Sequence, residues 1–321
     1  MIPLWRQIQK NNFTKLGPLL DFLEMVPEKR SQVLAHPTFV LNVPFRLAAK
    51  MEKNSLQDPL FKQFVPLKEE LDTSFGSTEP LQDQTFRRSK KLLQKYRGRA
   101  LFVTTGACAM NCRFCFRQNF PYETEEKGFQ QELAVLALDA SISEVILSGG
   151  DPLSLSDREL ASLFQELDKI PHIRRIRFHT RFPIGIPERI DAAFLEILQN
   201  CSKQIVFILH CNHPKELDEE ILANLKKIQK LGIPLLNQSV LLKGVNDEEG
   251  VLLTLSETLV NAGILPYYLH LHDPVQRTGH FDVPEERGQE LVRFLQENLS
   301  GYGVPHLVRE EPGKPSKTFK G

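Results

Sequence analysis

The sequence is poor in cysteine, has no excess of either charge and contains no long apolar run. Its 40 Lys and Arg residues balance 40 Asp and Glu residues, which argues against binding nucleic acid mainly through bulk charge. No apolar run reaches the roughly 18 residues that a membrane-spanning helix needs, and residues 1–12 lack the apolar core of a secretory signal. Five cysteines in 321 residues do not make a disulfide scaffold. We therefore expect a cytoplasmic protein that binds neither membranes nor nucleic acids.

The composition is that of a folded protein, and the chain has distinct segments. A hydrophobic fraction of 41% with 25% charged residues is typical of a globular protein and excludes long disorder. In residues 1–95, apolar residues recur at helical spacing between Pro and Gly, so we expect mostly helix there. Residues 67–77 are acidic and polar, which predicts a linker or an exposed loop. A tail rich in Pro, Gly and Lys follows residue 300.

From residue 99 onward, short β-rich runs alternate with amphipathic helical stretches. The expected strands span 99–105, 144–150, 173–180, 204–210, 234–240 and 265–271. The expected helices span 128–140, 156–170, 187–200, 214–232, 247–263 and 284–299. Six consecutive βα units predict an α/β fold whose parallel sheet has right-handed crossovers and is open or curled into a partial barrel.

Polar residues and glycines occupy the C-terminal end of each expected strand or directly follow it. They are Thr104, Thr105, Ser148, Gly149, Gly150, Asp151, His179, Thr180, Arg181, His210, Cys211, Asn212, Gln238, Ser239, His272 and Asp273. In parallel α/β folds, catalytic groups collect at the C-terminal ends of the strands. A scaffold without chemistry would not need polar residues at all of these ends, so the pattern predicts an enzyme.

Three of the five cysteines lie within eight residues, directly after the first expected strand. Cys108, Cys112 and Cys115 form a C-x3-C-x2-C pattern. Three thiolates on one loop suit a [4Fe–4S] cluster whose fourth iron is free to chelate a small molecule through an amine and a carboxylate. Structural zinc usually takes four ligands, so a zinc site here would need a nearby histidine. A third interpretation is that these are incidental buried thiols.

Several motifs together carry a resemblance to a known family. C-x3-C-x2-C is the signature of radical S-adenosylmethionine (SAM) enzymes, and SGGDPL at residues 148–153 resembles their glycine-rich motif. The segments KYRGRALFVTTGACAMNCRFCFR, HTRFPIGIPERI, HCNHPKELDEEI, NQSVLLKGVND and PYYLHLHD resemble lysine 2,3-aminomutase, over roughly residues 92–317. The C-terminal PSKTF resembles the branch that makes β-lysine for modifying translation elongation factor P. The resemblance implies a helical region at 1–95, a partial (β/α)6 barrel at 96–300, and a tail at 301–321 that carries a cofactor lysine.

The resemblance also implies a second cofactor, pyridoxal 5′-phosphate (PLP), beside SAM. The SAM-binding residues that it implies are Ser148, Gly149, Gly150, Asp151, His210 and Gln238. Matching the tail to the family's glycine-rich stretch makes Lys317 the lysine that forms a Schiff base with PLP, with Lys314 as the alternative. This chain departs from the family pattern there, because only one glycine of the stretch is present. Tyr96 and Arg99 match PLP-binding positions, and Lys95 stands where the family has Arg.

Three charged residues match positions that bind the substrate in the family. Arg117, two residues after the last cysteine of the motif, matches the Arg that binds the substrate carboxylate, a task that a bidentate guanidinium suits. Asp273 matches an acidic residue that holds the side-chain ammonium of lysine. Glu310 falls on a second such position, where the family has Asp. Two carboxylates at the far end of the cavity would favour lysine over shorter or acidic amino acids.

The remaining histidines and cysteines are assigned no cofactor. His270 and His272 alternate on one strand face, and a metal site using them with His210 and His213 is an alternative, but we expect hydrogen-bonding cavity walls. The cysteines outside the motif, expected to be ordinary buried thiols, are Cys201 and Cys211. Longer family members carry an additional cysteine cluster that binds zinc, and we expect no zinc here, because this sequence ends without one.

The resemblance implies an isomerase that moves the amino group of L-lysine from carbon 2 to carbon 3, giving β-lysine. The cluster and SAM would generate a 5′-deoxyadenosyl radical, which takes hydrogen from lysine held as a PLP aldimine. The implied partners are L-lysine, an electron donor such as flavodoxin or ferredoxin, and a ligase that attaches β-lysine to elongation factor P; a homo-oligomer is compatible with the sequence. Two alternatives stay open: an aminomutase of lysine catabolism or osmolyte synthesis, and a non-catalytic iron–sulfur redox or regulatory protein.

Overall fold

The computed structural model describes residues 2–123 and 128–321, which fold around a ten-stranded sheet with its strands in chain order. Neighbouring strands from β3 to β9 pair in parallel, whereas the β1–β2, β2–β3 and β9–β10 pairs are antiparallel. The strands are β1 (Arg87–Ser89), β2 (Leu92–Tyr96), β3 (Arg99–Thr105), β4 (Glu144–Gly149), β5 (Arg175–Thr180), β6 (Gln204–Leu209), β7 (Leu235–Val240), β8 (Leu265–His270), β9 (His306–Arg309) and β10 (Thr318–Phe319). Strands β3 to β8 confirm the six strands expected from the sequence.

The expected helices are present between and after these strands. They are α6 (Gln130–Leu138), α7 (Asp157–Asp168), α9 (Ala192–Gln199), α10 (Glu219–Gln229), α11 (Glu249–Asn261) and α12 (Glu285–Asn298), with a short additional helix, α8 (Phe182–Gly185). Helix α7 begins at a capping box, in which the Ser156 hydroxyl accepts from the Glu159 backbone N–H and the Glu159 carboxylate accepts from the Ser156 backbone N–H. This pairing of the first-turn donors explains why α7 begins where the sequence predicts.

Two short strand pairs at the ends of the sheet were not predicted. Strand β1 and all but the last residue of β2 lie inside residues 1–95, where mostly helix was expected, so residues 87–89 and 92–95 depart from that expectation. Leu92 and Leu93 are both buried, and Gly98 adopts a φ of 75°, a left-handed conformation that suits glycine at the turn into β3. Strands β9 and β10 extend the opposite side of the sheet, and β9 buries Leu307 and Val308. Pairing with an existing sheet stabilises these strands, which are too short to show a period.

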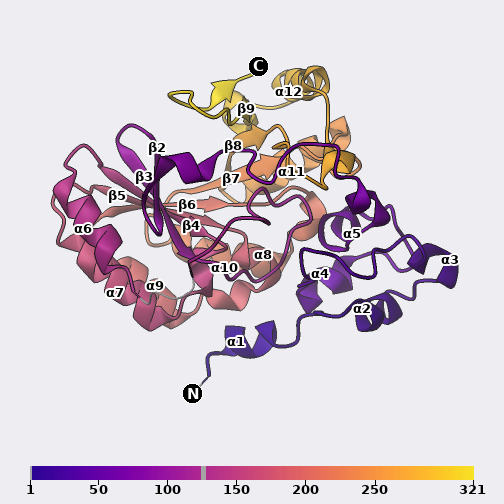
Figure 1. The fold of residues 1–321 in the computed structure, drawn as a ribbon, viewed down its shortest axis with the longest axis horizontal. Coiled ribbons are helices and arrows are strands. Elements are labelled where there is room, and N and C mark those ends of the chain that lie inside the picture. The colour runs from indigo at the N-terminus through magenta and orange to yellow at the C-terminus, as the bar shows by residue number, and fades with distance from the viewer. Residues whose placement is uncertain (1, 124–127) are drawn as a thin grey trace.

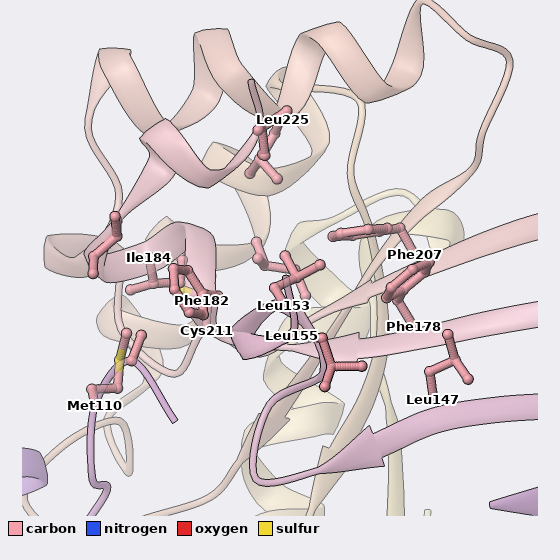
Figure 2. Packing of buried hydrophobic residues seen from close by; sticks show 14 of the residues in the cluster. Met110, Leu147, Leu153, Leu155, Phe178, Phe182, Ile184, Phe207, Cys211 and Leu225 are labelled. Atoms are coloured by element: carbon pink, nitrogen blue, oxygen red, sulfur yellow. The ribbon is translucent and has the colours of Figure 1, made fainter. Parts of the chain in front are cut away.

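Aromatic and aliphatic side chains fill the space between the sheet and its covering helices. Figure 2 shows Phe178 of β5 and Phe207 of β6 side by side, with Leu225 of α10 above the sheet. The two phenyl rings lie 5.2 Å apart between centroids, and all three side chains are buried. Burial of each such side chain stabilises the fold by about 1.5–3 kcal/mol. The core therefore fixes the positions of the strands, whose C-terminal ends carry the polar residues.

The N-terminal part of the chain forms short helices that lie together beside the barrel helices, as Figure 1 shows in indigo. They are α1 (Leu4–Gln9), α2 (Leu16–Phe22), α3 (Pro27–Arg30), α4 (Phe45–Lys50) and α5 (Pro59–Phe64). In the described residues, no helix combines the length and apolar character needed to cross a membrane.

The segment 67–77 is largely exposed, as its polar composition suggested: residues 68–69, 71–74 and 76–77 are exposed. It also contains a single-turn helix, η1 (Lys68–Leu71), whose Glu70 is buried. The Glu70 carboxylate accepts two hydrogen bonds from the buried guanidinium of Arg113, from Nε at 2.8 Å and from Nη2. Arg113 lies between Cys112 and Cys115, so this ion pair ties the cysteine loop to the N-terminal part of the chain.

Candidate active site

One cavity reaches from the start of β3 to the loops that follow the strands, and residues of β2 to β5, of β7 and β8, of the loop after β6 and of the C-terminal tail line its wall. Alternate residues of single strands contribute to it, as Arg99 and Leu101 of β3 or His179 and Arg177 of β5 do. Because one face of successive strands borders a single cavity, the sheet curves around it in the manner of a partial barrel. This cavity contains most of the site residues that the sequence predicts.

The three motif cysteines line the cavity from the loop that follows β3. Burial raises the pKa of each thiol, and it raises that of Cys115 to about 11. Among the described residues, no three His, Cys, Asp or Glu side chains are placed to hold a single metal ion. A cubane cluster does not require three side chains around a single metal ion, because each cysteine binds a different iron. Of the cysteines in the described residues, only these three line the cavity, and three soft thiol ligands fit a [4Fe–4S] cluster with one open iron.

The glycine-rich segment after β4 packs directly against the cysteine loop. A Cβ added to Gly149 would lie 2.5 Å from the carbonyl oxygen of Thr105, and one added to Gly150 would lie 2.4 Å from that of Ala107. The backbone N–H of Gly150 donates to the Thr105 carbonyl at 2.6 Å. Side chains at these two positions would push the loops apart, so both glycines are needed to keep this segment beside the cysteine loop.

Asp151, which the resemblance assigns to SAM, is already bonded within the chain. Its carboxylate accepts from the Thr180 hydroxyl at 2.8 Å and from the backbone N–H groups of Arg181, Phe182 and Leu153 at 2.8–3.0 Å. Burial raises the pKa of Asp151 to about 6, and the hydrogen bonds oppose this rise. Asp151 therefore links the β4 and β5 loops and borders the cavity, and its contact with SAM stays a prediction.

His210 and Gln238 border the cavity with polar atoms that are free to bind a ligand. None of the described residues hydrogen bonds to His210 Nε2, to Gln238 Oε1 or to Nε2 of the neighbouring His270. Burial lowers the pKa of His210 to about 3, so the imidazole is neutral. Unpaired buried polar atoms are costly unless a ligand or water satisfies them, and these atoms fit a polar cofactor such as SAM.

The tail brings Lys317 into the cavity, whereas Lys314 is exposed and does not line it. Lys317 Nζ donates to Glu310 Oε2 at 2.7 Å and lies 5.8 Å from the ring centroid of Tyr268. Glu310 also accepts from Lys95 Nζ at 3.1 Å, and these two ammonium groups lower the pKa of Glu310 against the effect of its burial. The site expected for the PLP lysine thus holds a partly buried carboxylate between two lysines.

Tyr96 and Arg99 lie together at the turn between β2 and β3, near Glu310 of the tail. The guanidinium carbon of Arg99 lies 4.7 Å from the ring centroid of Tyr96, and both residues line the cavity. Burial and the nearby Glu310 raise the pKa of the Tyr96 phenol. A cation, a phenol and a lysine amine around one cavity are the groups that a phosphorylated aldehyde cofactor needs, so these residues fit PLP.

Arg117 is buried and held on one side by a residue that the sequence analysis missed. Its Nε donates to Asp83 Oδ2 at 3.0 Å, and its Nη1 donates to the Ser148 hydroxyl at 3.3 Å. Asp83 also pairs with Lys95 Nζ at 2.6 Å. Asp83 begins a single-turn helix, η2 (Asp83–Phe86), in a polar stretch that carries no sequence signal for a buried carboxylate.

Asp273 borders the cavity beyond the end of β8, near Glu310 and Lys317. Burial and the charge of Glu310 raise the pKa of Asp273 to about 7, although Lys317 and Lys95 oppose this rise. Its Oδ1 is buried, and no described residue donates a hydrogen bond to it. A buried carboxyl with a free oxygen and a pKa near 7 is suited to receive a ligand ammonium.

Of the histidines and cysteines that were assigned no cofactor, His270 and His272 line the cavity and the others do not. The Nδ1 atom of His213 instead accepts from the Lys215 backbone N–H at the start of a single-turn helix, η5 (Pro214–Glu216). His272 borders the cavity and stacks on Phe75 with ring centroids 5.8 Å apart. Cys211 is buried, as expected, whereas Cys201 is only partly buried and lies near Asp168.

Comparison with known proteins identifies the class to which this fold and cavity belong. Residues 102–255 match the Radical SAM superfamily. The chain superposes on the crystal structure of Streptococcus suis SuiB bound to its precursor peptide SuiA with a TM-score of 0.50 and 15% identity, over 69% of this chain and 50% of that one. At that identity the likeness concerns the fold alone.

Sequence relatives define the family within this class. The L-lysine 2,3-aminomutase of Haemophilus influenzae is 43% identical over 98% of this chain and 95% of its own. The enzyme of the same name from Escherichia coli is 43% identical over 88% of this chain and 84% of its own. That of Bacillus subtilis is 30% identical over 98% of this chain and 70% of its own. The chain belongs to the L-lysine 2,3-aminomutase family of radical SAM enzymes.

Proposed function

We propose that this protein converts L-lysine into β-lysine by moving the amino group from carbon 2 to carbon 3. The observation that carries the proposal is that one cavity contains both the three motif cysteines and Lys317, with Asp273 and Glu310 beside that lysine. A cluster-binding redox protein would need the cysteines alone. Relatives at 41–43% identity over most of the chain are named for this activity.

The three cofactors of the family have distinct places in the cavity under this proposal. Bound cluster and SAM supply hydrogen abstraction by a carbon-centred radical, and PLP supplies the imine nitrogen through which the amino group migrates. Cys108, Cys112 and Cys115 would hold the cluster, and Lys317 would hold PLP. SAM would lie between them, against the two glycines after β4 and the polar atoms of His210 and Gln238.

The chain's own charged residues would orient lysine between these groups. The buried guanidinium of Arg117 would bind the substrate carboxylate, since its position is already fixed by Asp83 and Ser148. Asp273 would receive the side-chain ammonium on its free oxygen, with Glu310 as the second carboxylate. A substrate without a distal ammonium would leave a buried carboxylate unpaired, and this cost selects lysine.

The test is a turnover assay under anaerobic conditions with the enzyme, L-lysine, SAM, PLP and dithionite. We expect β-lysine, detected by mass spectrometry after derivatisation, and no product from Lys317→Ala. The ultraviolet–visible spectrum of the isolated protein should contain both a broad iron–sulfur band and a PLP band. A protein that shows the iron–sulfur band but binds no PLP and forms no β-lysine would instead be a redox or regulatory protein.

We further propose that the product serves to modify translation elongation factor P, through a ligase that uses β-lysine, and that the enzyme works in the cytoplasm. The support is the resemblance of the C-terminal segment to the branch with this role. An electron donor such as flavodoxin or ferredoxin would reduce the cluster. Cells supplied with isotopically labelled lysine should carry labelled β-lysine on elongation factor P only when the enzyme is present. Labelled β-lysine that stays free would favour lysine catabolism or osmolyte synthesis.

A further inference from the structure

A buried arginine contacts one of the three motif cysteines. The Arg181 Nη1 atom lies 3.2 Å from Cys112 Sγ, within the distance of a hydrogen bond to sulfur. Its other terminal nitrogen, Nη2, donates to Gln63 Oε1 and to Glu216 Oε2, each at 2.7 Å. Arg181 immediately follows β5 and is buried, as are Gln63 and Glu216. The guanidinium is thus fixed between one thiol and one carboxylate.

The carboxylate that binds Arg181 is itself held firmly in place. Glu216 Oε1 accepts from the backbone N–H groups of Asn212 and His213 at 3.0 Å and from Gln63 Nε2 at 3.2 Å. The backbone N–H of Arg181 donates to Asp151 at 2.8 Å, which fixes the other end of the residue. These contacts come from α5, from η5 and from the β4 loop. The arginine therefore cannot turn away from Cys112 without breaking several buried hydrogen bonds.

We propose that Arg181 raises the reduction potential of the cluster by donating a charged hydrogen bond to the Cys112 sulfur, and that Glu216 limits this increase. Hydrogen bonds to cluster sulfurs and nearby net charge are the main ways in which a protein adjusts an iron–sulfur potential. A buried positive charge stabilises the reduced cluster, which carries one more electron. A buried negative charge acts in the opposite sense, and low local dielectric strengthens both effects.

The electron balance of the affected step is simple. The oxidised cluster takes one electron from a low-potential one-electron donor, and its core charge falls from 2+ to 1+. Arg181 and Glu216 keep their own charges during this step. The inference rests on the proposed function only for the presence of the cluster, and it requires neither PLP nor lysine. Iron and sulfide analysis of the unmodified protein tests that presence separately.

The test is an anaerobic redox titration of the cluster-loaded, SAM-free protein, followed by electron paramagnetic resonance of the reduced cluster. Arg181→Gln should lower the ratio of reduced to oxidised cluster at least tenfold at a fixed solution potential, which is a shift of about 59 mV for one electron. Glu216→Gln should shift the potential in the opposite direction. The double variant should lie between the two single variants, nearer to the unmodified protein. Arg175→Gln, at the start of the strand that precedes Arg181 but partly exposed and paired with Glu144, is the matched control and should leave the potential unchanged.

Opposite shifts of the two single variants would support the electrostatic role, because loss of packing alone gives no reason for a change of sign. Unchanged potentials would overturn the proposal, and so would shifts in the same direction. An unchanged potential combined with weaker SAM binding by Arg181→Gln would show that Arg181 binds SAM instead. If Arg181→Gln does not assemble a cluster, Glu216→Gln tests the proposal alone: it should raise the potential, and an unchanged or lower potential would overturn the proposal.

Discussion

Asp273 provides the sharpest test of the lysine site, because it should affect substrate affinity and protein stability in opposite directions. Its carboxyl is buried, and burial together with Glu310 raises its pKa to about 7 in the ligand-free cavity. Lysine binding requires the ionised carboxylate to face the substrate ammonium. Asp273→Asn keeps the size of the side chain but removes the charge, so we expect lysine binding to weaken by about 2–5 kcal/mol.

The pKa also predicts how affinity should vary with pH. With a pKa of about 7, Asp273 is mostly ionised at pH 8 and mostly protonated at pH 6. Binding of lysine at pH 6 therefore includes the cost of removing a proton, about 1.4 kcal/mol per pH unit below the pKa. We expect the dissociation constant of lysine to rise about tenfold from pH 8 to pH 6 in the native enzyme. Asp273→Asn should show weak binding with little dependence on pH in this window.

Protein stability should change with pH in the opposite direction to lysine affinity. The folded pKa of Asp273, about 7, lies above the usual value of 3.8, so the folded state binds the proton more tightly than the unfolded state does. Folding is therefore penalised increasingly as pH rises from about 4 to about 7, and the full penalty of roughly 4 kcal/mol applies above pH 7. Asp273→Asn removes this penalty, so the lysine-free variant should be more stable than the native protein at pH 8.

Isothermal titration calorimetry with lysine and chemical denaturation at pH 5 and pH 8 measure the two effects. Asp282→Asn is the matched control, because Asp282 also has a raised pKa but is partly exposed and lies outside the cavity. This control should bind lysine as the native enzyme does. An Asp273→Asn protein with native lysine affinity, or one that is less stable than the native protein at pH 8, would refute the reasoning.

Three further predictions concern the cluster, the cofactor lysine and the fold. Cys112→Ala should lose cluster iron and sulfide in anaerobic analysis, whereas Cys201→Ala should keep them; a Cys112→Ala protein that still cleaved SAM would contradict the ligand assignment. Borohydride reduction of the PLP-loaded protein, followed by peptide mass mapping, should place the pyridoxyl group on Lys317, which lines the cavity, and label on the exposed Lys314 would overturn that assignment. Arg113→Met should lower the free energy of unfolding by about 3–5 kcal/mol, because it leaves a buried carboxylate unpaired; an unchanged denaturation midpoint would contradict this.

The parts of the fold that were predictable are those with a strong local pattern. Strands β3 to β8 are short apolar runs at nearly regular spacing, and helices such as α7 can be predicted from their N-terminal cap and their apolar face. Strands β1 and β10 have three and two residues, and no local pattern separates such segments from loops. Their strand conformation comes from pairing with the sheet edge, which is a tertiary effect. Residues 67–77 are mostly exposed, as expected, but the sequence does not show that Glu70 among them is buried against Arg113.

The site residues that could be predicted lie in recognisable motifs, whereas the residue that was missed is defined by contacts between distant segments of the chain. Ser148, Gly149 and Gly150 lie in a recognisable segment, and the structure places all three beside the cysteines. Asp83 has no such signal, since its partners Arg117 and Lys95 lie in other segments of the chain. The contact between Lys95 and Glu310 joins residues 215 positions apart. Such long-range ion pairs depend on the folded geometry, so sequence alone could supply the charges but not the pairing.

These pairs form a continuous row of alternating charge along the cavity wall, from Arg117 through Asp83, Lys95 and Glu310 to Lys317. In the proposed function, Lys317 would turn from Glu310 to hold PLP, and its hydrogen bond to Glu310 Oε2 would be given up. Lys95 would still pair with the other oxygen of Glu310. The side-chain ammonium of the substrate lysine would then lie where Lys317 Nζ now contacts Glu310, near Asp273. One carboxylate would therefore serve first the cofactor lysine and then the substrate, so the ammonium site expected from the sequence coincides with the contact that Lys317 makes in the structure.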